Sequence, residues 1–150
     1  MALLAGTLYD PGSAVSKSTT ALLAMTALDT TNLRLTFTVP MSGRVLVRLA
    51  GTLHGATTFP QIQLGVLEGS TVKGRVTPAG MAGGNLAATT FLKVEGLFVV
   101  TGLSAAASLT WDAAYGVETV VASTGLKYGG PNDTTADNSF GGFAFEIWAA

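Results

Sequence analysis

The sequence predicts an all-β domain folded as a sandwich, a jelly roll or a closed barrel. About eight or nine segments alternate apolar and polar residues with a period of two, which is the pattern of strands with one buried face. Turn-forming Gly, Pro and Asn separate these segments roughly every ten residues, as in proteins built from short antiparallel strands. No long stretch keeps the period of an amphipathic helix. Short, regularly spaced strands without helices are typical of sandwiches and barrels.

The first half of the chain predicts four strands in two pairs. Residues 33–39 alternate apolar and polar side chains, and the Pro40–Gly43 turn leads into a second alternating segment at residues 44–53. Because Pro fixes φ and Gly tolerates positive φ, this turn forms either a hairpin or a corner between two sheets. Residues 61–68 and 71–77 flank a Gly-Ser turn, which predicts a hairpin.

The second half of the chain predicts further strands that end on an apolar segment. Residues 88–101 form one bent strand or two short ones, with Gly96 marking a bulge or kink. Residues 108–115 alternate regularly, and residues 117–122 form a shorter strand. The closing segment, residues 143–148, is apolar enough that we expect it to lie centrally in a sheet.

Four segments fall outside the strand pattern. Residues 1–19 are small, polar and broken by Pro and Gly, so we expect an extended N-terminal arm followed by one domain at residues 20–150. Residues 20–28 fit a short helix and an extended segment equally well. Residues 78–85 and 129–142 are rich in Gly, Pro and Asn and predict loops.

The composition describes an apolar chain with few charges. Of its 150 residues, 48% are hydrophobic and 11% are charged, and the formal net charge is -1. Burial of so much apolar surface offsets the ordering entropy, so disorder is excluded. The balanced charge provides no basic footprint for nucleic acid. Apolar residues also occur on strand faces opposite the expected core, at Leu46, Leu67 and Trp148. We therefore expect a second surface to be buried in an assembly.

No targeting or membrane-spanning segment is expected. The apolar N-terminal run lacks a positive charge and ends at Tyr9, Asp10 and Pro11. The richest later stretch, Ala21 to Leu28, is far shorter than the roughly 18–20 residues that cross a bilayer. We expect synthesis in the cytoplasm without a signal peptide and no contact with a membrane. The absence of cysteine excludes disulfides and thiolate metal sites.

The sequence indicates no catalytic, cofactor-binding or metal-binding residues, so we expect no enzyme and no cofactor. His54 is the only histidine, which excludes a multi-histidine metal site within one chain, and its place at a strand end fits a solvated turn. The loop at residues 129–142 carries oxygen ligands suited to Ca²⁺ without the spacing of a known calcium loop. We interpret these side chains as an exposed loop: Asn132, Asp133, Asp137 and Asn138.

Two segments carry a resemblance to a known family. Residues 35–47, LTFTVPMSGRVLV, resemble the stretch that joins two strands at the sandwich corner of C1q/TNF-like jelly rolls, and residues 142–147, GFAFEI, are similar to that family's closing strand. Small proteins of this kind, rich in Ala, Gly and Thr, are similar to tailed-bacteriophage virion proteins, namely head decoration proteins, head fibres and tail-tip modules. The resemblance covers roughly residues 30–148. Because the Tyr-rich closing pattern of C1q is missing, the resemblance implies no C1q-type ligand site.

The resemblance implies a trimeric jelly roll with a structural or attachment role. The leading hypothesis is a capsid decoration protein that binds and stabilises the outer surface of a phage head, with its own copies and the major capsid protein as partners. The alternative is a tail-tip or fibre-head module that binds a host receptor or glycan. A third hypothesis, a small carbohydrate-active or lectin-like module, would use Asp112 or Glu146. The candidate assembly contacts are Leu3, Leu4, Leu8, Tyr9, Leu46 and Trp148.

Overall fold

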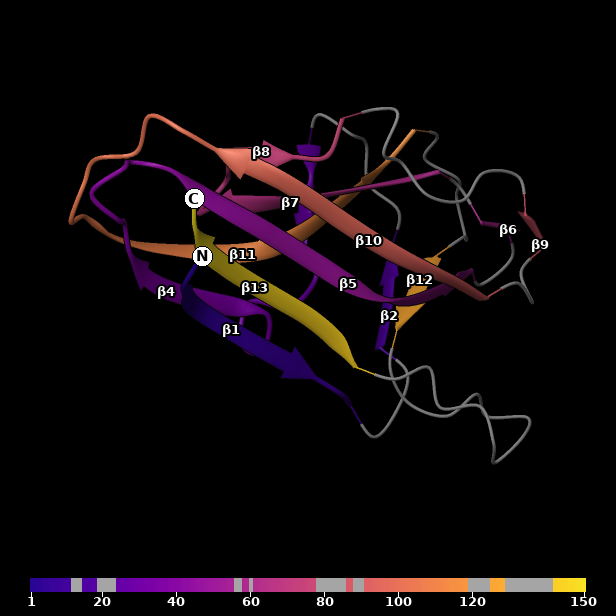
Figure 1. Cartoon of the computed structure of the whole chain (residues 1–150). Helices are drawn as coiled ribbons and strands as arrows, with labels where there is room; N and C mark the ends of the chain where they lie inside the picture. The colour runs from indigo at the N-terminus through magenta and orange to yellow at the C-terminus, as the bar shows by residue number, and fades with distance from the viewer. Residues whose placement is uncertain are drawn as a thin grey trace.

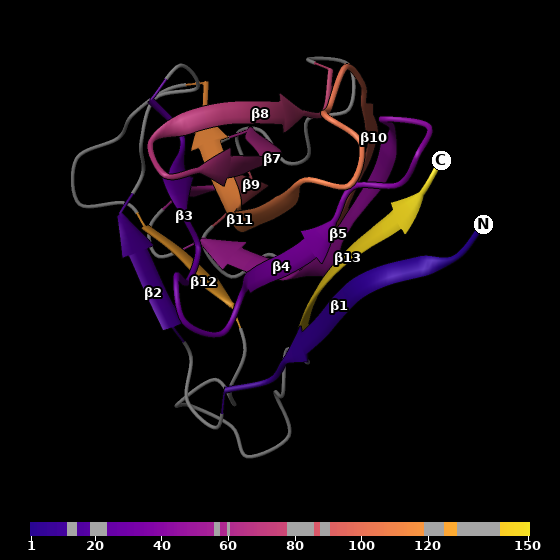
Figure 2. The ribbon, with the colours of Figure 1, turned by 90° about the vertical axis from the view of Figure 1, so that its left-hand side faces the viewer.

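The fold is a sandwich of two antiparallel β-sheets (Figures 1 and 2). The computed structural model describes residues 1–11, 15–18, 24–55, 58–59, 61–77, 86–87, 91–118, 125–128 and 142–150. Within these ranges nearly all regular structure is strand, and there is no α-helix. A short pair, β6 (Thr58–Phe59) with β9 (Leu86–Ala87), stands apart from the two sheets. The all-β prediction is confirmed.

The larger sheet is organised around its longest strand, β5. Its members are β1 (Leu3–Tyr9), β2 (Val15–Ser18), β5 (Val45–Gly55), β10 (Phe91–Val100), β12 (Gly125–Tyr128) and β13 (Phe143–Ala149). Strand β10 pairs with one side of β5, while β13 and β12 pair with successive parts of its other side. Strand β1 is the outer neighbour of β13, and β2 is the outer neighbour of β12. The closing strand therefore lies inside the sheet, as predicted.

The smaller sheet is organised around β11. Its members are β3 (Thr26–Ala27), β4 (Arg34–Thr38), β7 (Ile62–Glu68), β8 (Thr71–Arg75) and β11 (Ser108–Val117). The principal strands run β4-β11-β7-β8 here and β1-β13-β5-β10 in the larger sheet. Successive strands along the chain thus cross repeatedly from one sheet to the other, which is the jelly-roll arrangement.

The turn at residues 40–43 is a corner between the sheets, which decides between the two alternatives left by the sequence. It joins β4 of the smaller sheet to β5 of the larger one. The Gly43 amide donates to the Pro40 carbonyl at 2.9 Å. Gly43 has a φ of 63°, and an added Cβ would lie 2.7 Å from the Leu103 carbonyl oxygen. Glycine is therefore required here for both its conformation and its lack of a side chain.

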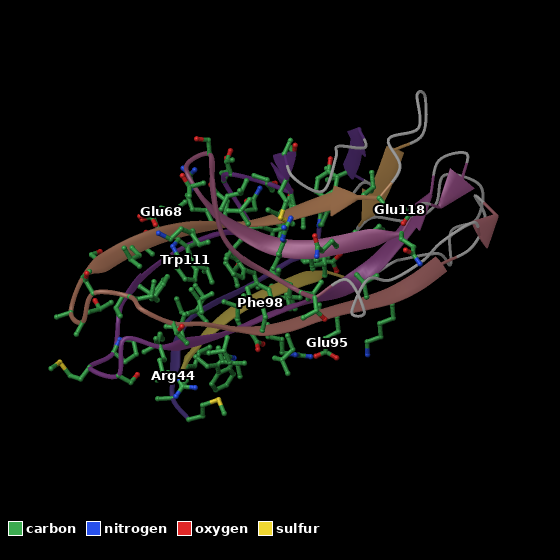
Figure 3. The ribbon with its side chains drawn as sticks, turned by 90° about the horizontal axis from the view of Figure 1, so that it is seen from above. Arg44, Glu68, Glu95, Phe98, Trp111 and Glu118 are labelled. Atoms are coloured by element: carbon green, nitrogen blue, oxygen red, sulfur yellow. The ribbon has the colours of Figure 1, made fainter. Side chains whose placement is uncertain are left out.

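The core fills the space between the two sheets, with Trp111 among its largest fully buried side chains (Figure 3). The Trp111 ring meets Phe37 edge to face, with ring centroids 4.9 Å apart. The predicted alternation places the inward side chains correctly on β4, β5, β11 and β13. The buried members on these strands include Leu35, Phe37, Val45, Val47, Leu49, Trp111, Ala113, Tyr115, Phe143, Phe145 and Ile147.

Gly96 does not mark a β-bulge, so that part of the prediction is wrong. Strand β10 is one strand, and Gly96 lies opposite Leu49 in an uninterrupted register. An added Cβ would lie 3.1 Å from the Leu64 Cβ and 3.1 Å from a Val76 methyl group. The glycine therefore allows β10 to approach β7 closely across the core, and the strand continues through it.

The N-terminal segment is extended, and its described strands belong to the larger sheet. We expected residues 1–19 to form an arm apart from the domain, but β1 pairs with β13 from Leu3 to Tyr9 and β2 pairs with β12. Leu4 and Tyr9 pack against the core. Pairing with β1 satisfies the backbone hydrogen-bonding groups along the edge of β13 and partly buries Leu4 and Tyr9. The segment therefore belongs to the sheet and does not stand apart from it.

Several predicted segments can be compared only in part. Within residues 20–28, the described part contains the extended β3. The backbone of His54 lies inside strand β5, where it pairs with β10 and β12, so the prediction of a turn residue is wrong. The loops predicted at 78–85 and 129–142 lie outside the described residues except for Gly142, as does most of the strand predicted at 117–122.

We expect Tyr115 to make the protein sensitive to alkaline pH. Burial raises the pKa of its phenol from 10.0 to about 12. The folded state therefore holds this proton more tightly than the unfolded state. That stabilisation is complete below about pH 10 and is lost as the pH rises through the folded pKa. Between these values the free energy of unfolding should fall by about 1.4 kcal/mol per pH unit. Urea titrations from pH 9 to 11 should give a flatter profile for Tyr115→Phe, and an equally steep profile would contradict the assignment.

Candidate functional site

The outer face of the larger sheet carries a continuous row of apolar side chains. Residues directly opposite each other in neighbouring strands point to the same side of a sheet. Leu3 lies opposite Trp148, Trp148 opposite Leu46, and Leu46 opposite Val99. The neighbours of these residues on β5 and β13 point into the core, so the row points outward. It crosses four strands, β1, β13, β5 and β10.

This row and its neighbours form a surface that we call the outer apolar face. Its members are Met1, Leu3, Leu46, Leu97, Val99 and Trp148. Leu97 is 57% exposed and Leu3 is 52% exposed, although both are large and apolar. A shallow groove of about 300 Å³ crosses the face and is lined by Met1, Leu46, Leu97 and Trp148 together with two charged residues. Surfaces of this kind commonly mark contact sites.

The two charged residues of the groove belong to an ion cluster that spans three strands. Arg48 Nε donates to Glu95 Oε1 at 2.6 Å, and Arg48 Nη1 lies 3.4 Å from Glu146 Oε2. Trp148 Nε1 donates to Glu146 Oε2 at 3.0 Å. Figure 3 shows Glu95 on the larger sheet, on β10. The hydrogen bond from Arg48 lowers the pKa of Glu95, and the same contacts raise the pKa of Arg48.

The outer face of the smaller sheet has a polar half. The Thr36 and Thr110 hydroxyl groups are hydrogen-bonded at 2.8 Å across β4 and β11. Next to them, Arg34 holds both carboxylate oxygens of Asp112, at 2.7 and 2.9 Å. The Asp112 side chain is only 4% exposed, whereas that of Arg34 is 46% exposed. The polar half contrasts with the apolar row on the opposite side of the molecule.

The other half of the outer face of the smaller sheet is covered by residues of the same chain. Leu67 packs with Met25 and Ala114 in a second apolar cluster, with Val72 at its margin. The sequence had suggested that Leu67, like Leu46 and Trp148, would be buried in an assembly. That expectation is wrong for Leu67, because residues from the neighbouring β-strands and from the chain before β3 already bury it.

The predicted assembly contacts divide into three groups. Leu3, Leu46 and Trp148 come together on the outer apolar face. Leu8 is 70% exposed and lies on the same side of β1, opposite Ala144. Leu4 and Tyr9 are partly buried and pack against the core, and an assembly contact through them stays a prediction. The loop residues Asn132, Asp133, Asp137 and Asn138 lie outside the described residues.

Sequence reasoning missed Leu97, Val99 and Met1. A signal was present for the first two, since Lys93 and Glu95 show which residues of β10 point outward, and Leu97 and Val99 continue that alternation. No such signal exists for Met1, because its place depends on the pairing of β1 with β13.

Neither a metal-binding cluster nor a pairing of Asp112 with Glu146 is found among the described residues. No three His, Cys, Asp or Glu side chains among them lie close enough together to hold a metal ion. Asp112 lies on the outer side of the smaller sheet and Glu146 on the outer side of the larger one, so these two acids do not form a glycosidase pair. A membrane-spanning helix is likewise not found in this part of the chain.

No protein-family model matches the sequence, and no curated protein matches it at a significant level. The resemblance to C1q/TNF-like proteins therefore rests on the two short segments at residues 35–47 and 142–147. Its fold component, the jelly roll, agrees with the strand order of the structure.

Proposed function

We propose that this chain is a non-enzymatic structural protein of a phage particle, a homotrimer that associates through its outer apolar face and decorates the outer surface of the head. The observation that carries the proposal of self-association is the apolar row across β1, β13, β5 and β10. The phage setting rests on the resemblance to small virion jelly rolls, and the jelly-roll strand order is in keeping with it.

A second copy of the chain fits this face better than a charged partner. The charges at its centre are already matched within one chain, because Arg48 contacts both Glu95 and Glu146. Lys93 lies two residues before Glu95 on the same side of β10 and adds a second positive charge. These four charges cancel at the centre of the face, so identical copies that meet there do not repel each other. The apolar side chains of the face favour association by leaving water.

Self-association can be tested with matched charge insertions. Light scattering after size exclusion at micromolar concentration should give three times the 15.2 kDa of the chain. Trp148→Glu and Leu46→Glu place a carboxylate in the apolar row and should give monomers. Thr38→Glu adds the same charge to the exposed outer side of β4 and should leave the trimer intact. Far-UV circular dichroism checks that each variant is folded. A wild-type monomer at this concentration would refute the proposal.

The location in the particle needs a separate experiment. A decoration protein should sediment with assembled phage heads and fail to bind host cells or their glycans. The opposite result would replace the decoration role by the tail-tip or fibre-head alternative, while leaving the trimer unaffected.

A further inference from the structure

We propose that the ion cluster of Arg48, Glu95 and Glu146 fixes the orientation and number of the copies that meet at the outer apolar face. This inference rests on the proposed self-association and assigns a specificity role to three residues within that surface. Two of its members, Arg48 and Glu146, are the charged residues that line an otherwise apolar groove. The three side chains of the cluster are 39%, 51% and 24% exposed, so water still reaches all three in the single chain.

Burial of the face would change the energetics of this cluster. Ion pairs that lose water gain less from mutual attraction than they lose in hydration, so apolar residues of equal size usually bind at least as tightly. The cluster is thus a poor device for affinity. It is an effective device for selectivity, because every arrangement that covers these charges with apolar side chains and separates their partners is disfavoured.

The layout of the cluster gives the face a direction. The row Gly6, Glu146, Arg48 and Leu97 lies next to the apolar row that contains Trp148. A copy shifted by one row would place its apolar side chains over the charges. Only arrangements that match the apolar rows and leave the cluster paired avoid this cost.

The cluster also spans strands β10, β5 and β13, so it is held together by the sheet itself. Arg48 bridges its two neighbours across the register, opposite Leu97 on one side and Glu146 on the other. The guanidinium is consequently restrained before any partner arrives, and little further side-chain entropy is lost on association. Such a prearranged cluster can select one geometry without rearranging.

The test compares the wild type with the apolar triple variant Arg48→Met, Glu95→Leu and Glu146→Leu. Native mass spectrometry should show one stoichiometry for the wild type. The triple variant should associate at least as tightly but as a mixture of stoichiometries. The control Lys73→Met with Glu68→Leu removes an ion pair of 2.9 Å from the smaller sheet and should keep a single stoichiometry.

A second variant keeps the inference testable if the triple variant does not fold. Arg48→Met alone leaves two carboxylates without their cation in the face, and we expect the association constant at pH 7 to fall at least about tenfold. Lowering the pH through the carboxylate range should restore association of this variant, because protonation removes the unpaired charges. Far-UV circular dichroism over the same pH range separates the two explanations, because a role in folding alone would make the folded fraction recover together with association.

The outcomes separate this inference from the proposed function. A trimeric wild type with an equally uniform triple variant, or an Arg48→Met variant with unchanged association at pH 7, would overturn the role of the cluster and leave the trimer standing. A wild-type monomer would overturn the proposed self-association and this inference together.

Discussion

Replacing Trp111 with alanine is expected to lower the free energy of unfolding by about 3–5 kcal/mol, as large-to-small changes of buried aromatic residues do. The Trp111 side chain is fully buried between the sheets and meets Phe37 edge to face. Its strand, β11, pairs with β4 on one side and β7 on the other, so the surrounding backbone cannot collapse into the cavity. Urea unfolding at one fixed protein concentration measures the loss, because association contributes to apparent stability.

Trp111→Phe is expected to be much milder, at about 1–2 kcal/mol. The indole Nε1 of Trp111 is buried without a hydrogen-bond partner among the described residues. Phenylalanine removes this unsatisfied donor while it keeps an aromatic ring beside Phe37. Met41→Ala is the surface control, since Met41 is 85% exposed and should change stability by less than about 0.5 kcal/mol. If the phenylalanine and alanine variants lost equal stability, the packing argument would be wrong.

The fold was predictable from sequence wherever one face of a strand is buried and the other is exposed to solvent. Residues 33–39 and 143–148 show this, since each alternates in the register that the structure buries. The corner at residues 40–43 was left ambiguous because a Pro-Gly turn has the same sequence in a hairpin. Only the pairing of β4 with β11 and of β5 with β13 decides it, and those contacts join distant parts of the chain.

The outer apolar face was predicted in part for a similar reason. Leu46 and Trp148 follow from alternation, because their neighbours on both sides point to the core. Leu67 has the same signature, but Met25 covers it, and no local pattern contains that contact. In β1, apolar residues occur on both sides of the strand, so alternation could not separate the inward Leu4 from the outward Leu3. Which residues of an edge strand point inward is decided by the strand with which it pairs.

Gly51 is sensitive to substitution for the same reason, because it contacts a distant part of the chain. No turn or repeat in the sequence indicates this contact. Gly51 lies on the inward side of β5, and an added Cβ would overlap Cδ2 of Phe143 and lie 3.0 Å from Cγ and Cε2 of the same ring. The Phe143 side chain is 1% exposed and belongs to the core cluster, so it has no free space to enter. Because of this overpacking, we expect Gly51→Ala to lower the free energy of unfolding by about 3 kcal/mol.

Two controls separate overpacking from a general effect of alanine in a strand. An added Cβ at Gly6 would meet its nearest atom, the Leu3 Cδ1, at 3.5 Å, which is ordinary contact. Gly6→Ala should therefore leave stability unchanged or raise it by up to about 1 kcal/mol, since alanine orders the unfolded chain. Phe143→Leu should relieve the overlap, so its combination with Gly51→Ala should cost at least about 1 kcal/mol less than the sum of the single changes. Additive losses would mean that the ring of Phe143 is not what excludes a side chain at Gly51.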